Sequence, residues 1–385
     1  MPTSSDALRV ALFSGNYNYI MDGPARALNK LVSHLAHRGH QALVFAPTVK
    51  KPAFPPTGDL ISIPSLALPG SRSEYRLGLG LWGNAKKHLD AFNPTLIHIA
   101  APDLTGYHAL KYAEKNNIPA VASFHTRFDT YPRYYRANWL EKYVTDYMRG
   151  FYGRCRHVYT PSQSMTEELE AEKIGKDIRL WTRGVDHSIF NPQRRSAGWR
   201  TALGFQPDEV VIAFVGRVVL EKGIDLFCEA VGLAQEKNSN IKALVVGEGP
   251  ERRRFERLLP EAQFVGFKQG EELARAYASA DVFFNPSITE TFGNVTLEAM
   301  ACGIPCICAA ASGSKTLVSH EAQGLLSDPA LGAAGFAGCI SRLAANPGER
   351  GRFAAGALAR SHEFSWESTL DDLLNNYKEA INDER

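Results

Sequence analysis

Short apolar runs and amphipathic stretches alternate along the first half of the chain. Residues 8–13 are nearly all apolar and predict a short buried strand, and residues 41–45 predict a second one. Between them, residues 24–38 carry leucine and valine at helical spacing, and Gly39 is placed to end that helix. The alternation continues at residues 95–99, 104–115 and 120–124. It indicates a parallel sheet covered by helices on both faces.

A second alternation of the same kind starts at residues 210–215. The elements predicted after it are a helix at 223–236, a strand at 241–246, a helix at 251–259, a strand at 282–285, a helix at 295–301 and a strand at 305–309. Because the pattern restarts, we expect two domains of roughly 150–200 residues each. One stretch breaks the pattern: residues 50–70 contain five prolines and little periodicity, and they predict a loop.

The composition, with 44% apolar and 22% charged residues, is that of a soluble globular protein. No apolar run reaches the roughly 18 residues needed to span a bilayer, and residues 1–6 lack the apolar segment of a signal peptide. We therefore expect a cytoplasmic protein, in which six cysteines do not form a disulfide framework. Residues 1–190 carry 23 Lys and Arg against 16 Asp and Glu, which suggests an anionic partner for the first half.

The clearest chemical signal is a pair of carboxylates, Glu290 and Glu298. Gly293 permits a tight turn, and we expect the next helix to start at about Asn294, a good cap residue. The backbone N–H groups of residues 291–294 then lie at the positive end of the helix dipole, which suits phosphate oxygens or sugar hydroxyls. Glu298 lies about one turn into this helix, where its carboxylate can accept two hydrogen bonds from a ribose diol. Apolar neighbours argue against two ordinary surface glutamates.

Two cations, Arg217 and Lys222, follow the predicted strand at residues 210–215. Fixed cations at a strand end can hold a diphosphate and stabilise the charge that develops when it departs, so no metal is required. A solvated basic loop is the alternative explanation. Gly247 and Gly249 end the next strand and can let a nucleoside approach the backbone, although such a pair is a weak signal alone. Ligands of parallel sheets bind at the carboxyl ends of the strands, so two such domains facing each other leave a cleft for them.

Several motifs in order resemble family 4 of the glycosyltransferases. They are Gly15 and Gly23, Ser123-Phe-His125-Thr, Gly184-Val-Asp186 with Phe190-x-Pro192, Gly216-Arg217 with Lys222-Gly223, Gly247-x-Gly249, Glu290 with Glu298, and Gly303-x-Pro305. The resemblance implies the α/β GT-B fold, with two Rossmann-like parallel-sheet domains facing each other across a cleft. The acceptor domain is then residues 1–187, the donor domain 188–365, and a last helix at 366–385 crosses back to the first domain. The family's usual double glycine and acidic residue are replaced by Ser312-Gly313-Ser314-Lys315, which leaves the role of Lys315 open.

The resemblance also implies roles for single residues. Arg217 and Lys222 bind the donor diphosphate, Glu298 binds the ribose, and Glu290 binds the transferred sugar. His125 lies beside that sugar at the reacting centre. The donor site is completed by Gly15, Gly23, Gly216, Gly247, Gly249, Phe292, Gly293, Asn294 and Val295. Transfer is expected to proceed with retention and without a metal, and the departing phosphate takes the acceptor's proton. The co-substrate is a UDP-sugar or, as an alternative, a GDP-sugar, with no other cofactor.

The acceptor is suggested by residues 123–156. Within the family, this segment is similar to bacterial and plant enzymes that make sulfoquinovosyl-, glucosyl- or mannosyl-type glycolipids. It mixes aromatic and basic residues, which suits an anionic bilayer surface. The residues expected at the acceptor or membrane are Arg127, Tyr131, Arg133, Tyr134, Tyr135 and Trp139. We therefore expect a hexosyltransferase acting on diacylglycerol, ceramide or a glycolipid, peripheral on the inner face of the cytoplasmic membrane. The alternative is an amphipathic helix whose aromatic residues fill the first core.

Other functions stay open beside this one. A glycosyltransferase of polysaccharide or lipopolysaccharide assembly, acting on a soluble or carrier-linked glycan, has the same donor site. A sugar-nucleotide epimerase shares the architecture but lacks the spacing of Glu290 and Glu298. A dinucleotide-dependent oxidoreductase is disfavoured because Gly15 is not part of a Gly-x-Gly-x-x-Gly run. A binding module without activity is expected to have lost His125, Arg217 or Glu290, and all three are present.

Overall fold

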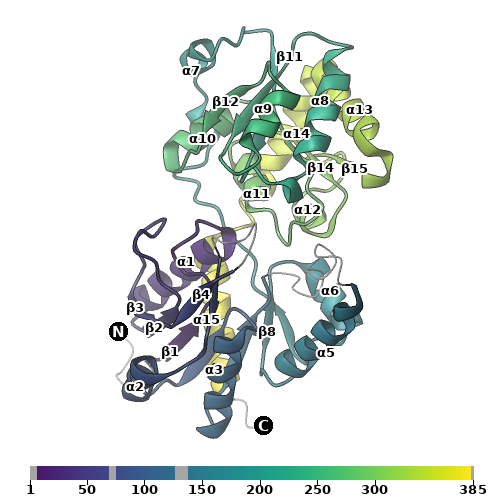
Figure 1. Ribbon diagram of the computed structural model, residues 1–385. Helices are drawn as coiled ribbons and strands as arrows, with labels where there is room; N and C mark the ends of the chain where they lie inside the picture. Colours follow the sequence, from purple (N-terminus) through teal and green to yellow (C-terminus); the bar gives the residue numbers. More distant parts are fainter. Residues whose placement is uncertain (1–6, 69–74, 126–137, 383–385) are drawn as a thin grey trace. The chain divides into compact units, whose positions relative to one another are not determined.

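The computed structural model describes residues 7–68, 75–125 and 138–382. Two compact units make up the chain (Figure 1). The first unit consists of Met1–Thr182 together with Glu367–Arg385, and the second consists of Arg183–Trp366. Each unit is built around a parallel sheet, so the predicted α/β class is confirmed.

The first unit holds a seven-stranded parallel sheet among its described residues, in the order β3-β2-β1-β6-β7-β8-β9. In that order the strands are β3 (Asp59–Ser62), β2 (Gln41–Ala46), β1 (Arg9–Phe13), β6 (Leu96–Ile99), β7 (Ala120–Ser123), β8 (Val158–Thr160) and β9 (Ile178–Leu180). From β1 the chain winds towards β3, and from β6 it winds the opposite way towards β9. The carboxyl ends of β1 and β6 therefore flank the switch point, where open α/β sheets bind their ligands.

Helices and a small hairpin complete the first unit. The elements are α1 (Gly23–His37), the hairpin β4 (Ser65–Ala67) with β5 (Arg76–Gly78), α2 (Gly83–Phe92), α3 (Leu104–Lys115), the 3₁₀ helix η3 (Asn138–Leu140), α5 (Glu141–Tyr152) and α6 (Gln163–Ala171). Helix α1 begins where the Asp22 carboxylate accepts a hydrogen bond from Ala25 N, with Pro24 in the first turn. Helix α3 begins in the same way at Asp103, which accepts from Gly106 N.

The loop prediction for residues 50–70 is wrong in part, because β3 lies within it. This strand pairs in parallel with β2, from Leu43 opposite Asp59 to Ala46 opposite Ser62. It is the edge strand of the sheet, and its side chains are exposed or only partly buried. It therefore needs no continuous apolar run. The prolines flank the strand rather than interrupt it.

The last helix, α15 (Trp366–Asn382), packs within the first unit for nearly all of its length. Its buried face carries Leu370, Leu373, Leu374 and Tyr377, as predicted from their spacing. Two side chains of α1 hold its outer edge: His34 Nε2 lies 2.8 Å and an Arg38 guanidinium nitrogen 2.5 Å from the carboxylate of Asp371. Apolar packing and these ion pairs together bind the end of the chain to the first unit.

The second unit holds a six-stranded parallel sheet in the order β12-β11-β10-β13-β14-β15. In that order the strands are β12 (Gln263–Gly266), β11 (Ile241–Val246), β10 (Val210–Val215), β13 (Val282–Asn285), β14 (Cys306–Ala309) and β15 (Gly324–Ser327). The helices are α7 (Ala197–Ala202), α8 (Ile224–Gln235), α9 (Arg252–Leu258), α10 (Gly270–Ala278), α11 (Asn294–Ala301), α12 (Ser312–Leu317), α13 (Gly332–Ala345) and α14 (Pro347–Ser361). The winding changes direction between β10 and β13, which is the switch point of this unit.

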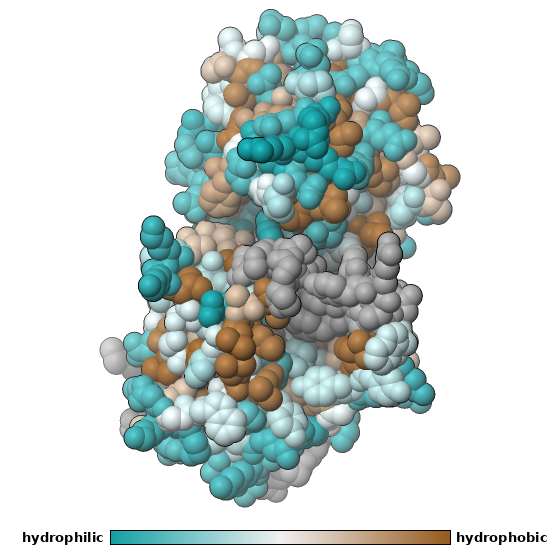
Figure 2. Space-filling model, in the orientation of Figure 1, coloured by the Kyte–Doolittle hydropathy of each residue, from teal (hydrophilic) through white to brown (hydrophobic). Residues whose placement is uncertain are grey.

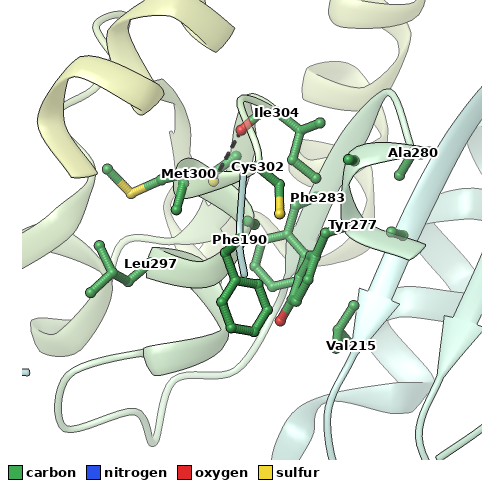
Figure 3. Packing of buried hydrophobic residues seen from close by; sticks show 14 of the residues in the cluster. Phe190, Val215, Tyr277, Ala280, Phe283, Leu297, Met300, Cys302 and Ile304 are labelled. Carbon is green, nitrogen blue, oxygen red and sulfur yellow. Dashed lines mark hydrogen bonds between the residues drawn. The ribbon is translucent and has the colours of Figure 1, made fainter. Parts of the chain in front are cut away.

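Side chains of this sheet alternate between two apolar clusters. Val211, Ala213 and Val215 of β10 enter one cluster, while Val210, Ile212 and Phe214 enter the other. Figure 3 shows part of the first cluster, with Phe190, Tyr277 and Phe283 packed together. A strand buried on both faces explains the uninterrupted apolar run at residues 210–215.

The chain passes between the units at Thr182/Arg183 and at Trp366/Glu367. The sequence analysis placed the first of these boundaries after residue 187. The division falls earlier because Val185 and Phe190 are already part of the core of the second unit. In that unit, Val185 N donates a hydrogen bond to Phe364 O, and a Cβ on Gly184 would lie only 2.2 Å from Trp366 N. A glycine is therefore required where the two segments run side by side.

Three further features bear on the predicted class of protein. Within residues 7–68, 75–125 and 138–382, no helix has both the length and the apolar composition to cross a membrane. The same residues include no cluster of three or more His, Cys, Asp or Glu side chains able to hold a metal ion. All six cysteines are free thiols, and five of them are buried.

Candidate active site

Two charged side chains of the second unit meet at the carboxyl end of its sheet. Glu290 lies in the loop that follows β13, and Lys222 ends the short 3₁₀ helix η5 (Leu220–Lys222) that follows β10. Lys222 Nζ lies 2.5 Å from Glu290 Oε1, and the side chains are 28% and 13% exposed. The strands β10 and β13 are neighbours at the switch point, which explains how residues distant in sequence come together.

The loops that carry this pair are held by hydrogen bonds and close packing. Ser287 Oγ and Thr289 Oγ1 each donate to the carbonyl oxygen of Glu221, at 3.3 Å. On the other side, a Cβ on Gly313 of α12 would lie 2.3 Å from the carbonyl oxygen of Glu290. The glycine thus lets α12 touch the loop of Glu290 directly. Lys315, also in α12, is exposed.

Glu298 lies on α11, one turn after its start, and is only 5% exposed. Its Oε2 accepts a hydrogen bond of 3.2 Å from the hydroxyl of Tyr277. The helix begins at Asn294 as predicted, but the cap prediction is wrong. Gly293 occupies the cap position with a left-handed φ of 95°, so the cap residue supplies no side-chain hydrogen bond to the helix. Glycine suits this position because a residue with a Cβ rarely adopts a left-handed conformation. The first N–H groups of α11 have no acceptor within the helix.

The glycines at the ends of β10 and β11 bring two loops into contact. A Cβ on Gly247 would lie 1.9 Å from Gly216 O, and a Cβ on Gly249 would lie 2.2 Å from Val218 O. Val218 N also donates to Glu248 O at 3.0 Å. The packing of the chain itself therefore demands glycine at 247 and 249. It fixes the backbone on both sides of Arg217, which is partly buried.

The loop after β1 in the first unit is closed by its own hydrogen bonds. The Asn16 amide donates to Asp22 Oδ2 at 2.8 Å and to Ile20 O at 3.0 Å, and Tyr19 OH donates to Gly15 O at 2.7 Å. Gly23 is the first residue of α1. A Cβ on Gly15 would make ordinary contacts, at 3.6 Å from Asp103 Oδ2 and 3.7 Å from Ala101 Cβ. Among the residues that the structure describes, no contact therefore demands glycine at position 15.

Asp103 is a group at this edge that the sequence analysis did not single out. It follows β6, caps α3 through Oδ1 and approaches Gly15 with Oδ2. Burial raises the pKa of its carboxyl to about 6, although backbone hydrogen bonds act in the opposite direction. The signal in the sequence is an aspartate directly before a helix at a strand end, which by itself indicates only a cap.

Asp103→Asn is expected to stabilise the protein at pH 7 and to change little at pH 4. Because the folded-state pKa lies above the ordinary value of 3.8, the aspartate favours folding below about pH 4, and this contribution is lost as pH rises through 6. The shift corresponds to at most about 3 kcal/mol, and asparagine keeps the cap. Urea unfolding of both proteins from pH 4 to 8 measures the difference. A free-energy difference independent of pH would contradict the raised pKa.

His125 lies two residues after the end of β7 and is buried. Its ring packs against Trp181, with centroids 5.6 Å apart. Trp181 also contacts His98, whose ring bridges Ser123 Oγ, at 2.9 Å, and the hydroxyl of Tyr377. Burial lowers the pKa of His98 to about 3, so this imidazole is neutral. A chain of buried side chains thus supports the His125 segment from α15.

The predicted acceptor segment is described only in part. Arg127, Tyr131, Arg133, Tyr134 and Tyr135 lie outside the described residues. Trp139 of η3 and Tyr143 of α5 are 71% and 68% exposed. Met148, Phe151 and Tyr152, further along α5, belong to the core of the first unit. The described aromatic residues are therefore divided: the early ones face solvent and the later ones fill the core. The alternative prediction, an amphipathic helix whose aromatic residues fill the core, holds for the later ones.

Two family models match this chain. The one described as "Glycosyltransferase Family 4" matches residues 21–189, and the one described as "Glycosyl transferases group 1" matches residues 197–360. A GDP-mannose-dependent alpha-mannosyltransferase of Mycolicibacterium smegmatis is 30% identical over 383 residues, which cover 97% of this chain and 98% of that protein. The chain belongs to family 4 of the glycosyltransferases.

The chain is also similar to a plant enzyme in sequence and to a cyanobacterial enzyme in structure. A sulfoquinovosyl transferase of Arabidopsis thaliana is 32% identical over 253 residues, which cover 64% of this chain and 49% of that protein. The structure of a sucrose-phosphate synthase from Thermosynechococcus elongatus matches with a TM-score of 0.77 at 23% identity, over 97% of this chain and 98% of the other. The predicted GT-B fold is thereby confirmed.

Proposed function

We propose that this glycosyltransferase moves a hexosyl unit from a nucleotide sugar to a membrane lipid. The observation that carries the donor side is the ion pair of Lys222 and Glu290 at the carboxyl ends of β10 and β13, on the same unit as the buried carboxylate of Glu298. A cation for a diphosphate and two carboxylates for hydroxyl groups are the polar groups that an activated sugar requires. The enzyme uses a nucleotide sugar, as members of its family do.

The donor is held by groups of opposite character. Arg217 and Lys222 bind the diphosphate, Glu298 accepts the ribose hydroxyls, and Glu290 accepts hydroxyls of the sugar. The N–H groups at the start of α11, from Phe292 to Asn294, face the sugar with the positive end of the helix dipole. When the donor is bound, the Lys222 ammonium lies between the diphosphate and Glu290, which keeps its side chain oriented.

The reaction breaks the bond between the anomeric carbon and the diphosphate oxygen. The acceptor hydroxyl forms the new bond on the same face of the sugar, and its proton goes to the departing phosphate oxygen. Arg217 and Lys222 neutralise the charge that builds up on that phosphate, so the chemistry needs no metal ion. Retention of configuration follows from attack on the face that the leaving group vacates.

The acceptor side is supported by exposed apolar residues of the first unit. Figure 2 shows hydrophobic residues gathered over β4 and the start of α3. Exposed large hydrophobic side chains of the first unit include Leu66 of β4, Leu77 of β5, Trp82 just before α2 and Leu104 of α3. Tyr147 OH donates a hydrogen bond to Pro102 O, which connects α5 to the segment just before α3. Exposed aromatic and aliphatic side chains of this kind suit contact with a lipid surface.

A transfer assay on vesicles tests both halves of the proposal. The vesicles consist of phosphatidylcholine with diacylglycerol and with phosphatidylglycerol, on the order of 20 mol%, which makes their surface anionic. They are incubated with the enzyme and labelled GDP-mannose or UDP-glucose. We expect label in the organic phase with one donor, and GDP-mannose is favoured because two relatives that align with 97% of this chain are GDP-mannose-dependent alpha-mannosyltransferases. The same donor should raise the melting temperature without vesicles, since it binds the native state.

Two negative outcomes have different meanings. If a nucleotide sugar raises the melting temperature but label reaches only a soluble glycan, the lipid acceptor is wrong and the alternative of glycan assembly holds. If neither donor is bound or consumed with any acceptor, the proposed donor site is wrong. Formation of an epimer of the donor in the absence of acceptor would instead indicate an epimerase.

A further inference from the structure

A buried tyrosine of the second unit contacts a carboxylate that the proposed function uses. Tyr277, in the last turn of α10, has no exposed surface, and its hydroxyl donates to Glu298 Oε2 at 3.2 Å. Residues 183–366 contain no other tyrosine. The two residues come from different helices, α10 and α11, so this hydrogen bond is a tertiary contact and not a consequence of helical spacing.

The ring of Tyr277 is itself fixed by aromatic packing. Its centroid lies 6.1 Å from that of Phe190 and 5.9 Å from that of Phe283, with interplanar angles of 69° and 64°. Figure 3 shows the ring beside Phe190 and Phe283, with its hydroxyl oxygen directed to the side on which Phe190 and Val215 lie. Val215 is the last residue of β10, directly before Gly216 and Arg217. The hydroxyl therefore lies on the side of the ring where β10 ends.

A hydrogen bond of this kind limits the conformations of the carboxylate. Glutamate has three rotatable side-chain bonds, and a rigid donor restricts them before a ligand arrives, which lowers the entropy lost on binding. A carboxylate has about four lone-pair positions, so the bond from Tyr277 is compatible with further bonds from a ribose diol. A buried carboxylate also needs a donor for stability alone, and the experiment must separate these two roles.

We propose that Tyr277 is a positioning residue that orients Glu298 towards the ribose of the nucleotide donor. The inference rests on the proposed function, which assigns the ribose to Glu298. Tyr277 does not touch the donor in this scheme and acts only through the carboxylate. Its effect therefore depends on the ribose hydroxyls of the ligand, whereas an effect of stability alone does not.

Tyr277→Phe tests the inference because it removes one hydroxyl and keeps the ring. Binding of UDP and GDP, and of their 2′,3′-dideoxy forms, is measured by calorimetry. For the ribonucleotide that binds, we expect affinity to fall about 5- to 10-fold, because Glu298 keeps its charge and loses only the bond that orients it. Affinity for the dideoxy form should stay within about 2-fold, because no hydroxyl is present for Glu298 to accept. The donor KM should rise with the ribonucleotide loss, and kcat should change little.

The control variants separate failure of the inference from failure of the proposed function. Phe227→Leu removes a buried ring from the other apolar cluster of this unit, which does not include Tyr277, and should lower the melting temperature while leaving the ratio of ribo- to dideoxynucleotide affinity nearly unchanged. Glu298→Gln should reduce that ratio. If Glu298→Gln reduces it and Tyr277→Phe does not, Tyr277 has only a structural role and the inference is overturned. If Glu298→Gln leaves the ratio unchanged, the ribose assignment fails, and the proposed function fails with it.

Discussion

Replacing Lys222 by alanine is expected to lower kcat for transfer by about 10²- to 10³-fold, the usual cost of removing a group that stabilises charge in the transition state. The ammonium faces Glu290 at 2.5 Å and in our scheme also faces the departing diphosphate. Its interaction with the diphosphate strengthens as the glycosidic bond breaks, so the loss falls on kcat more than on KM. Glu290→Gln should lower kcat by a similar factor, because an amide holds the sugar and Lys222 less firmly.

The stability of both variants should change little, since the pair is partly exposed. Such a pair contributes on the order of 1 kcal/mol to the free energy of unfolding. Arg254 and Asp225 supply a matched control in the same unit: they form an ion pair of 2.8 Å between α9 and α8, with side chains 45% and 53% exposed. Arg254→Ala should retain full activity. Equal activity of Lys222→Ala, Glu290→Gln and Arg254→Ala would place the donor elsewhere.

The strands of both sheets were largely predictable because most are buried. A strand enclosed by helices on both faces is nearly all apolar; β10 carries that pattern without interruption, and β11 departs from it only at Lys242. The edge strand β3 has no such constraint and was taken for a loop. No element was predicted between residues 310 and 363, where the structure has α12, β15, α13 and α14. Alanine and glycine dominate that stretch, and they pack closely without producing a strong apolar periodicity.

The charged residues of the site were predictable, but their supports were not. Lys222 directly precedes Gly223, and Glu290 and Glu298 lie on either side of Gly293, which is a local signal. Tyr277 resembles any core aromatic residue in the sequence, and its contact with Glu298 joins two helices whose relative placement the sequence does not specify. The Asn294 cap prediction failed for a related reason, because a left-handed Gly293 already occupies the cap position.

Gly247→Ala is expected to destabilise the protein by at least about 3 kcal/mol, and it is the change that tests the arrangement of the two strand-end loops. Gly247 has a φ of 142°, and a Cβ there would lie 1.9 Å from the carbonyl oxygen of Gly216. A backbone oxygen within a hydrogen-bonded loop cannot move aside as a flexible side chain can. The added methyl group must therefore separate the loops after β10 and β11.

Gly216→Ala provides the matched control, because Gly216 has a similar φ of 151° but no atom of the described residues within 4 Å of the position of a Cβ. It carries the conformational strain without the steric overlap and should cost only about 1–2 kcal/mol. Urea unfolding of the two variants therefore isolates the overlap as the difference between them. The separation of the loops should also reach the site, since Arg217 stands between Gly216 and Val218, and both of these contact the other loop. Equal unfolding free energies for the two variants would mean that the loops do not touch as the structure has them, and Arg217 would then lack the backbone support that fixes it for a diphosphate.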